Sequence, residues 1–181
     1  MSKRRNNRRS RREVLSGAVA AVAVGSFPFV ARAQNKPIKI GMPTIQSGRA
    51  AMVGSSSRNG CLMEIEKFNA AGGLGGRMVE LVARDTKGKP EEAARLSREL
   101  VNSDGCEILF DAESSAGAFA IHEVAKDLGV VVMHMNSETS SLTADPKLRI
   151  PNAFRAARQG IHDSIAAGSY AGKIAKAKGL K

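Results

Sequence analysis

Short apolar segments alternate with longer amphipathic segments along most of this chain, and this alternation restricts its fold more than any other feature. Four short segments predict β-strands: 38–42, 78–83, 107–110 and 130–133. The first three are followed by segments that predict helices: 55–70, 90–104 and 114–128. No hairpin turn signal joins two strands, so each strand must connect to the next through a helix or a long loop. The pattern predicts an α/β fold with a parallel sheet flanked by helices.

Local signals predict where these elements end and which faces they bury. Pro43 is expected to end the first strand. The first helix is expected to pack inward through Cys61, Leu62, Ile65 and Phe68. The third is expected to do so through Ile121, Val124 and Leu128. The strand 130–133 is apolar throughout, which predicts a strand covered on both faces.

The part of the chain after residue 134 has a different pattern. Residues 135–151 are rich in Ser, Thr, Asn and Pro and predict a long connection. A short segment, 152–156, and a helix over about 160–178 follow it. The sequence stops after that helix, where the alternation calls for another strand. We therefore expect a truncated second α/β unit that is only begun.

The first 33 residues read as an export signal. A basic region is followed by an apolar region, 14–30, and then by Ala31-Arg32-Ala33, which fits a cleavage site. The pair Arg11-Arg12 resembles the twin-arginine motif, which predicts contact with the twin-arginine export machinery. An ordinary secretory signal is the alternative. A membrane-spanning helix is disfavoured, because a span needs about 20 apolar residues and Gly25 and Pro28 interrupt this one. The mature chain is expected to begin near Gln34, in the periplasm.

The strongly basic composition comes mostly from this leader. The formal net charge is +11, and the leader supplies +7 of it from eight basic residues and one acidic residue. The remaining 148 residues carry 20 basic and 16 acidic side chains. There is no Trp, one Tyr and no basic stripe interleaved with aromatic residues, so we do not expect nucleic acid as a partner.

The sequence does not fit several common catalytic and cofactor motifs. The glycine cluster 72–76 follows a predicted helix, whereas a dinucleotide fingerprint follows a strand, so no nucleotide cofactor is expected. His122, His134 and His162 lack metal-ligand spacing and read as core or surface histidines. Residues 111–115 lack the glycines of a hydrolase nucleophile elbow.

The two cysteines, Cys61 and Cys106, are too few for a disulfide framework. They read as small buried apolar side chains, with a single disulfide as the alternative.

The remaining interpretation is a ligand-binding site at one edge of the predicted sheet. In a parallel α/β sheet, ligands collect beyond the carboxyl ends of the strands. Three polar loops are predicted there: 44–48 with Gln46, 111–115, and 135–139 with Ser137. Ser114 and Ser115 stand at a predicted helix start, where free backbone N–H groups favour a carboxylate. A simple helix cap is the structural alternative, and the two roles are compatible.

Several motifs in this order resemble one protein family. Residues 68–77 (Phe-Asn-Ala-Ala-Gly-Gly-Leu-Gly-Gly-Arg) look like the helix-to-strand junction of type I periplasmic solute-binding proteins of branched-chain amino acid ABC importers. Ile40-Gly41 with Ser47-Gly48 after it, Asp85 before Pro90, and Leu142-Thr143 follow the order of that family. The resemblance runs from about Lys36 to the end.

The resemblance implies two α/β lobes joined by hinge strands. It assigns 1–33 to the leader, 34–153 to an incomplete first lobe, and 154–181 to the hinge crossing and the first helix of the second lobe. It implies that Ser115 binds a ligand carboxylate and that the Asn136 carbonyl takes an amino group. Glu138 replaces a hydroxyl residue of the family, which Thr139 can supply if the loop shifts by one. Val53 replaces an aromatic residue, which implies a roomier pocket.

By the same resemblance, this is a non-enzymatic component of an ABC importer, without a cofactor. It would bind an amino acid, an amide or an aromatic acid and deliver it to a permease in the inner membrane. Glu138 argues against an α-amino acid, because an acid would repel the carboxylate. The alternatives are a ligand-sensing receptor or regulator of the same fold and, less favoured, a secreted α/β hydrolase.

Overall fold

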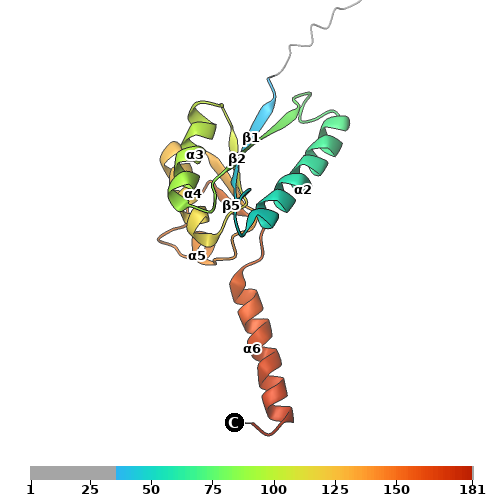
Figure 1. Ribbon diagram of the computed structural model, residues 1–181, viewed down its shortest axis with the longest axis vertical. Coiled ribbons are helices and arrows are strands. Elements are labelled where there is room, and N and C mark those ends of the chain that lie inside the picture. Colours follow the sequence, from blue (N-terminus) through green and yellow to red (C-terminus); the bar gives the residue numbers. More distant parts are fainter. Residues whose placement is uncertain (1–35, 181) are drawn as a thin grey trace, which may run out of the picture. The chain divides into compact units, whose positions relative to one another are not determined.

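A computed structural model describes residues 36–180, so the predicted leader and the twin-arginine pair lie outside the described residues. Five parallel strands form one sheet in the order β2-β1-β3-β4-β5 (Figure 1). The strands are β1 Ile38–Thr44, β2 Val79–Asp85, β3 Ile108–Asp111, β4 Val131–His134 and β5 Ala153–Arg155. The predicted parallel α/β sheet is therefore confirmed, with residues 153–155 added as a fifth strand beside β4.

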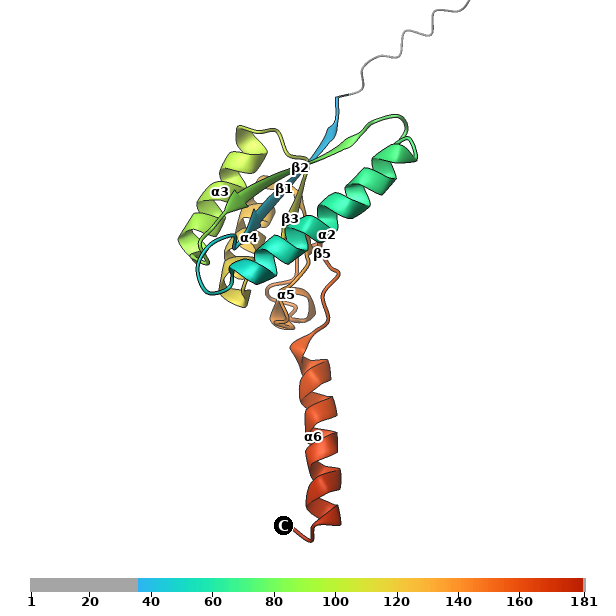
Figure 2. The same cartoon turned by 45° about the vertical axis from the view of Figure 1, so that its right-hand side comes forward.

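Helices flank this sheet on both faces. The flanking helices are α2 Ala51–Ala70, α3 Pro90–Asn102 and α4 Ser115–Leu128, and the described residues also form α5 Ser141–Ala144 and α6 Gly160–Ala177. Helices α3 and α4 pack side by side against one face, and α2 crosses the other (Figure 2). No helix among residues 36–180 is long and apolar enough to cross a membrane.

The core lies between the sheet and the α3–α4 layer. Leu100, Leu109, Ile121 and Val132 are completely buried there. Ile121 and Val124 point inward as predicted, but Leu128 is 37% exposed. It is the last residue of α4, and Gly129 ends the helix in the left-handed conformation with φ 66°, so Leu128 lies past the edge of the core.

The opposite face of the sheet is less covered than the sequence predicted. Val131 is 38% exposed, so the prediction that its strand is covered on both faces is wrong for the described residues. In α2, Gly54 is the buried residue, and Phe68 of the predicted inward face is 44% exposed. The reason is that α2 crosses this face with few close contacts, whereas α3 and α4 pack tightly on theirs.

Several boundaries also differ from the prediction by one to four residues, and those of β1 and α2 lie near the edge loops. Pro43 does not end β1, because Thr44 still pairs with Asp85 on one side and with Ala112 on the other. A proline removes one donor from the ladder, but its fixed φ is compatible with an extended chain. Helix α2 begins at Ala51 rather than Ser55, four residues earlier than predicted.

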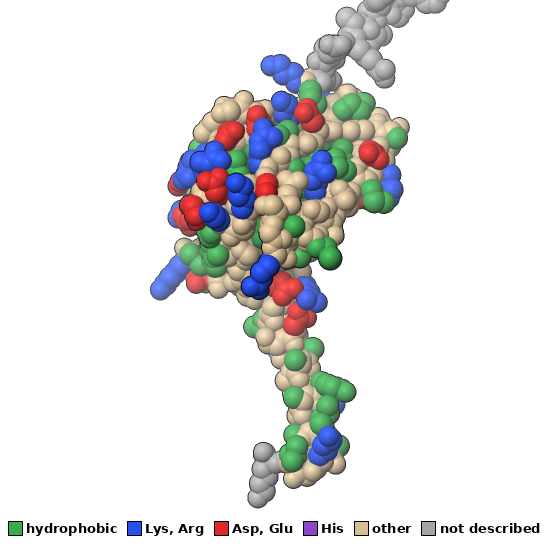
Figure 3. Space-filling model, in the orientation of Figure 1, with side chains coloured by type: hydrophobic (Ala, Val, Ile, Leu, Met, Phe, Trp, Pro, Cys, Tyr) green, Lys and Arg blue, Asp and Glu red, His purple; other side chains and the backbone are tan. Residues whose placement is uncertain are grey.

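The long connection contains structure that the sequence pattern did not predict. The short helix α5 lies in it, and Leu142 in this helix is completely buried. The predicted last helix is present as α6, and none of its residues is buried. Apolar side chains along α6 are exposed (Figure 3): Ile161, Ile165, Tyr170 and Ile174.

Candidate functional site

The sheet order brings the three predicted loops to one edge. Strands β1, β3 and β4 are consecutive neighbours and run parallel, so the segments after their carboxyl ends are adjacent. These segments are 45–50, 112–114 and 135–140. The predicted meeting of polar loops at the carboxyl edge of the sheet is thus present in the structure.

Ser114 and Ser115 differ in their surroundings at the start of α4. Ser114 is the N-cap of α4, and its Oγ accepts a hydrogen bond from the Gly117 N–H at 3.4 Å. Ser115 is the first residue of the helix, and its side chain is exposed at the positive end of α4. Ser114 therefore caps the helix, while Ser115 faces solvent at the edge.

Glu113 lies directly before this cap and was missed by the sequence analysis. Its side chain is only 4% exposed. It accepts hydrogen bonds from the Thr86 hydroxyl and, at 3.3 Å, from the Ser114 N–H. Burial raises the pKa of Glu113 despite these donors. A Cβ at position 117 would lie 2.5 Å from the Glu113 Oε2, so Gly117 leaves the space that this carboxyl occupies.

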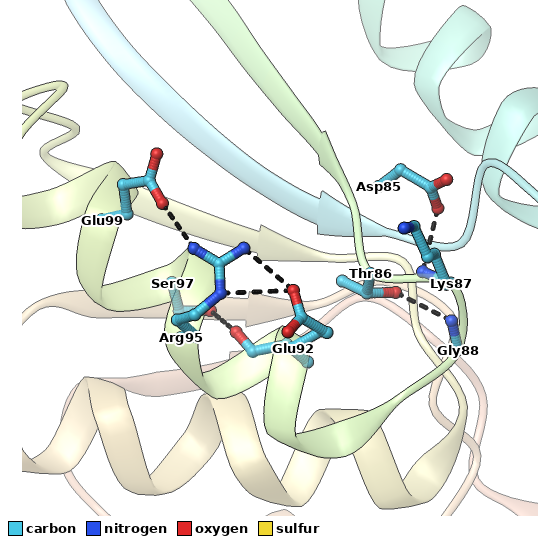
Figure 4. A network of polar contacts seen from close by, with 9 residues as sticks. Asp85, Thr86, Lys87, Gly88, Glu92, Arg95, Ser97 and Glu99 are labelled. Atoms are coloured by element: carbon cyan, nitrogen blue, oxygen red, sulfur yellow. Dashed lines mark hydrogen bonds and ion pairs between the residues drawn. The ribbon is translucent and has the colours of Figure 1, made fainter.

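The end of β2 positions the Gln46 backbone. The Asp85 carboxylate accepts a hydrogen bond from the Gln46 N–H at 2.9 Å. It also accepts one from the Lys87 N–H at 2.9 Å (Figure 4). Burial acts to raise the pKa of Asp85, but hydrogen bonds from Ser47, Gln46 and Lys87 lower it overall. The Thr86 Oγ also accepts from the Gly88 N–H at 3.2 Å. Asp85 thus joins two edge loops, and the Gln46 side chain is left half-buried.

Asn136 ties the loop after β4 to helix α2. Its Nδ2 donates to the Ser57 Oγ at 2.9 Å, and this hydroxyl lies 2.9 Å from the Val53 carbonyl. Val53 itself is 53% exposed near the start of α2. The structure therefore links two predicted site residues, Val53 and Asn136, through Ser57, which the sequence analysis did not single out.

Arg155 of β5 fixes the backbone of the same loop. Its guanidinium donates to the carbonyls of Ser137 and Thr139, and its Nε donates to the Thr143 Oγ at 3.1 Å. The Ser137 hydroxyl is buried without a hydrogen-bond partner among the described residues. Residues 137–139 are consequently held by a charged side chain from the neighbouring strand.

The Glu138 side chain forms an ion pair with Arg158. Its carboxylate accepts from the Arg158 Nη2 at 2.8 Å and Nε at 3.1 Å, and its carbonyl accepts from the Gly160 N–H at 2.8 Å. The ion pair is largely exposed, with 65% of the Arg158 side chain and 48% of the Glu138 side chain accessible. The negative charge at this position is therefore paired within the chain.

A separate cavity of about 320 Å³ lies beside α2. It is lined by Ser57, Gly60, Cys61, Glu64, Phe110, Met135 and Asn136. Asn136 is the one predicted site residue in its wall. The other candidate residues lie outside it, so this cavity does not bring the predicted ligand contacts together.

The structure also tests the other motifs. His122 and His134 are buried core histidines, and His162 is exposed on α6, as the sequence indicated. Within residues 36–180, no hydrogen bond joins Ser114 or Ser115 to a histidine, and no group of three or more His, Cys, Asp or Glu could hold a metal ion. Cys61 and Cys106 are both free thiols.

Comparison with known proteins gives the relatives of this chain. The family model described as periplasmic binding protein matches residues 37–181. The leucine-, isoleucine-, valine-, threonine- and alanine-binding protein of Pseudomonas aeruginosa is 29% identical over 72% of this chain and 34% of its own length. Leu/Ile/Val-binding protein homolog 4 of Brucella abortus is 29% identical over 88% of this chain and 42% of its own length. The chain spans less than half the length of these relatives.

Solved structures show the same likeness. The branched-chain amino acid transporter substrate binding protein of Streptococcus pneumoniae, in complex with isoleucine, is 27% identical with a TM-score of 0.62 over 68% of this chain and 34% of that one. An ABC transporter solute binding protein of R. palustris, in complex with 4-hydroxybenzoate, is 26% identical. Its TM-score is 0.64 over 79% of this chain and 36% of that one. The match over residues 37–181, together with the parallel sheet and its edge loops, shows that this chain belongs to the periplasmic binding protein family.

Proposed function

We propose that this chain provides a solute-binding lobe of an ABC importer and acts without catalysis or a cofactor. The observation that carries the proposal is the exposed Ser115 at the positive end of α4, next to the loop after β4. A hydroxyl and free backbone N–H groups at a helix start suit a carboxylate or carbonyl oxygen. The family match and the importer proteins among the similar structures support this function.

The solute class is inferred to be an amino acid or an aromatic acid. Similar proteins bind isoleucine and 4-hydroxybenzoate, and both ligands carry a carboxylate. Arg158 pairs with Glu138, and this pairing weakens the repulsion that the sequence predicted between that acid and a ligand carboxylate. Gln46, Val53, Ser114, Ser115 and 136–139 are proposed as the residues around the solute.

The proposal also assigns a role to each part of the chain. Residues 1–33 direct export to the periplasm, 34–153 form the first lobe, and 154–181 cross the hinge and begin the second. The loaded protein delivers its solute to an inner-membrane permease. Replacing Arg11 and Arg12 with lysine should leave the precursor in the cytoplasm, because the export receptor reads the guanidinium pair. Normal export of that variant would indicate the general secretory route.

The binding proposal is tested by titrating the isotope-labelled chain with millimolar amino acids, amides and hydroxybenzoates and recording its amide NMR spectrum. One lobe offers only part of the contacts, so weak binding is expected, with shifts at Ser115, Ala116 and 136–139. Ser115→Ala removes a hydrogen bond to a charged group. The expected loss is about 1.5–3 kcal/mol, or roughly ten- to a hundredfold in affinity.

Ser103→Ala is the matched control, because Ser103 is an exposed serine at the end of α3, near the opposite edge of the sheet. It should leave the affinity unchanged. If Ser115→Ala binds as tightly as the control, or if the shifts fall on the α3–α4 face, the proposed edge is wrong.

A further inference from the structure

Three buried ionisable side chains form a hydrogen-bonded chain beneath the candidate edge. Asp111 and His134 are completely buried at the ends of β3 and β4, and His122 of α4 is 1% exposed. The Asp111 Oδ2 contacts the His134 Nδ1, the His134 Nε2 lies 3.1 Å from the His122 Nδ1, and the His122 Nε2 lies 2.9 Å from the Leu148 carbonyl oxygen. The proposed solute site uses none of these groups.

The contacts determine how many protons this chain of side chains must hold. The Leu148 carbonyl can only accept, so the His122 Nε2 carries a proton. Burial lowers the pKa of His122 and outweighs the hydrogen bond to the Leu148 carbonyl, which raises it, so a neutral ring is favoured and its Nδ1 is an acceptor. The His134 Nε2 must then donate to His122, which uses the second proton.

The contact between Asp111 and His134 determines the total number of protons. A neutral His134 that donates from Nε2 has a lone pair on Nδ1, and this lone pair would face an ionised Asp111 oxygen at hydrogen-bonding distance. Two acceptors without a proton repel each other, and the repulsion is strong in a buried site. A third proton is therefore required between Asp111 and His134. With three protons the group has no net charge, whichever of these two side chains holds the third.

We propose that Asp111, His134 and His122 act as one proton-holding unit that carries three protons in the folded chain and makes the carboxyl edge of the sheet sensitive to pH. Loss of the third proton leaves a buried negative charge and breaks the Asp111–His134 hydrogen bond. Both residues also anchor the edge through their backbone. The Asp111 carbonyl accepts from the Met135 N–H at 3.0 Å, and the His134 carbonyl accepts from the Ala156 N–H at 3.0 Å.

Charged side chains from β5, from α4 and from the segment between β3 and α4 lie near this unit. Arg155 of β5 interacts with Asp111 and holds the carbonyls of the loop after β4. Glu123 and Lys126 lie on α4 near His122, where Glu123 raises the pKa of the ring and Lys126 lowers it. Glu113 lies near Asp111. The Arg155 cation offers the main rival arrangement, in which it balances an ionised Asp111 while both histidines stay neutral with two protons in total.

The two arrangements predict opposite effects of pH on stability. In the unfolded chain, each histidine titrates near pH 6.5 and the aspartate near 3.9. Near pH 6.5 the unfolded group therefore holds about three protons, as the folded unit does, and the contribution to stability is greatest there. Above about pH 7.5 the unfolded group holds about one proton fewer, so the folding equilibrium constant should fall nearly tenfold per pH unit. Below about pH 5.5 it should fall again as pH decreases.

The test is urea unfolding of the full chain between pH 5 and 8.5. Three chains are compared: wild type, Asp111→Asn and the control His162→Gln, which changes the exposed histidine of α6. In Asp111→Asn, an amide N–H can donate to the His134 Nδ1, so the chain of hydrogen bonds is complete with both rings neutral. Wild type and control should both lose stability as pH rises above about 7.5. In Asp111→Asn, the folding equilibrium constant should not fall as pH rises above about 7.5.

A wild-type equilibrium constant that rises to a plateau above pH 7.5 would favour the two-proton arrangement and overturn the proposal. A fall of the folding equilibrium constant above about pH 7.5 that is as large in Asp111→Asn as in wild type would also overturn it. If that variant does not fold, side-chain nitrogen NMR of the wild type gives a second measurement. Near pH 7 it should show a neutral His122 and a proton on the Nε2 of each ring, and an unprotonated His134 Nε2, or a His134 Nδ1 without a hydrogen bond to Asp111, would contradict the proposal.

Discussion

The Arg158 guanidinium binds the Glu138 carboxylate through Nη2 and Nε, at 2.8 and 3.1 Å, and so joins the loop after β4 to the segment between β5 and α6. Arg158 also lies 3.2 Å from the Asp163 carboxylate in the first turn of α6. The pair raises the pKa of Arg158. Glu138 is thus held by a partner from the neighbouring segment.

Breaking this ion pair should have a small effect on stability, because both side chains are largely exposed. A double-mutant cycle with Glu138→Gln and Arg158→Gln should give a small coupling energy that shrinks as salt is added. Urea unfolding at low and high salt measures it. The Arg95–Glu99 pair on α3 is the comparison (Figure 4). A coupling energy well above that of the comparison pair would show that the Glu138–Arg158 pair is part of a larger ordered network.

Two glycines in α2 should respond oppositely to the same substitution. At Gly54 an added Cβ would lie 1.9 Å from the Ile45 carbonyl oxygen, whereas at Gly60 nothing lies within 4 Å. Gly54→Ala should therefore push α2 away from β1 and cost about 1–3 kcal/mol. Gly60→Ala should stabilise the helix by about 0.5–1 kcal/mol. Thermal or urea unfolding of both variants checks the pair. Equal effects would mean that α2 does not approach the loop after β1 this closely.

Glu113 should make the folded chain lose stability as pH rises. Its pKa is raised from an ordinary value of 4.5 by burial, so above pH 4.5 the folded state binds the proton more tightly than the unfolded state. Stability then falls as pH increases towards the raised pKa and levels off above it. Glu113→Gln should abolish this component of the fall. Urea unfolding from pH 4.5 to 7 measures it, with the exposed Glu91→Gln as the control. An unchanged pH profile in Glu113→Gln would contradict the prediction.

The two thiols should differ in reactivity. Cys106 is 4% exposed, and burial together with Asp104 raises its pKa to about 11, so very little thiolate exists at neutral pH. Burial raises the pKa of Cys61 as well, but this residue is half-buried on α2 and borders the cavity. An alkylating reagent should modify Cys61 first and Cys106 only in urea. Peptide mass spectrometry reads both sites. A mass loss of two hydrogens without a reductant would instead indicate the disulfide.

The sequence by itself determined the features that depend on neighbouring residues. The alternation of apolar and amphipathic segments was sufficient for a parallel α/β sheet, because hydrophobic periodicity reflects which face of each element is buried. Ser114 and Ser115 were placed at a helix start because capping is a local preference. The basic excess of the leader and its apolar region were equally readable as predictions of export.

Tertiary structure decided the contacts between distant segments. Asp111, His134 and His122 look unrelated in the sequence, and they meet only because β3 and β4 pair in parallel and α4 packs over them. The Thr86–Glu113 contact likewise spans 27 residues. The exposed face of β4 was not predictable either, because an apolar strand does not reveal which helices cover it. These outcomes depend on strand order and packing, which bring together side chains whose sequence spacing carries no signal.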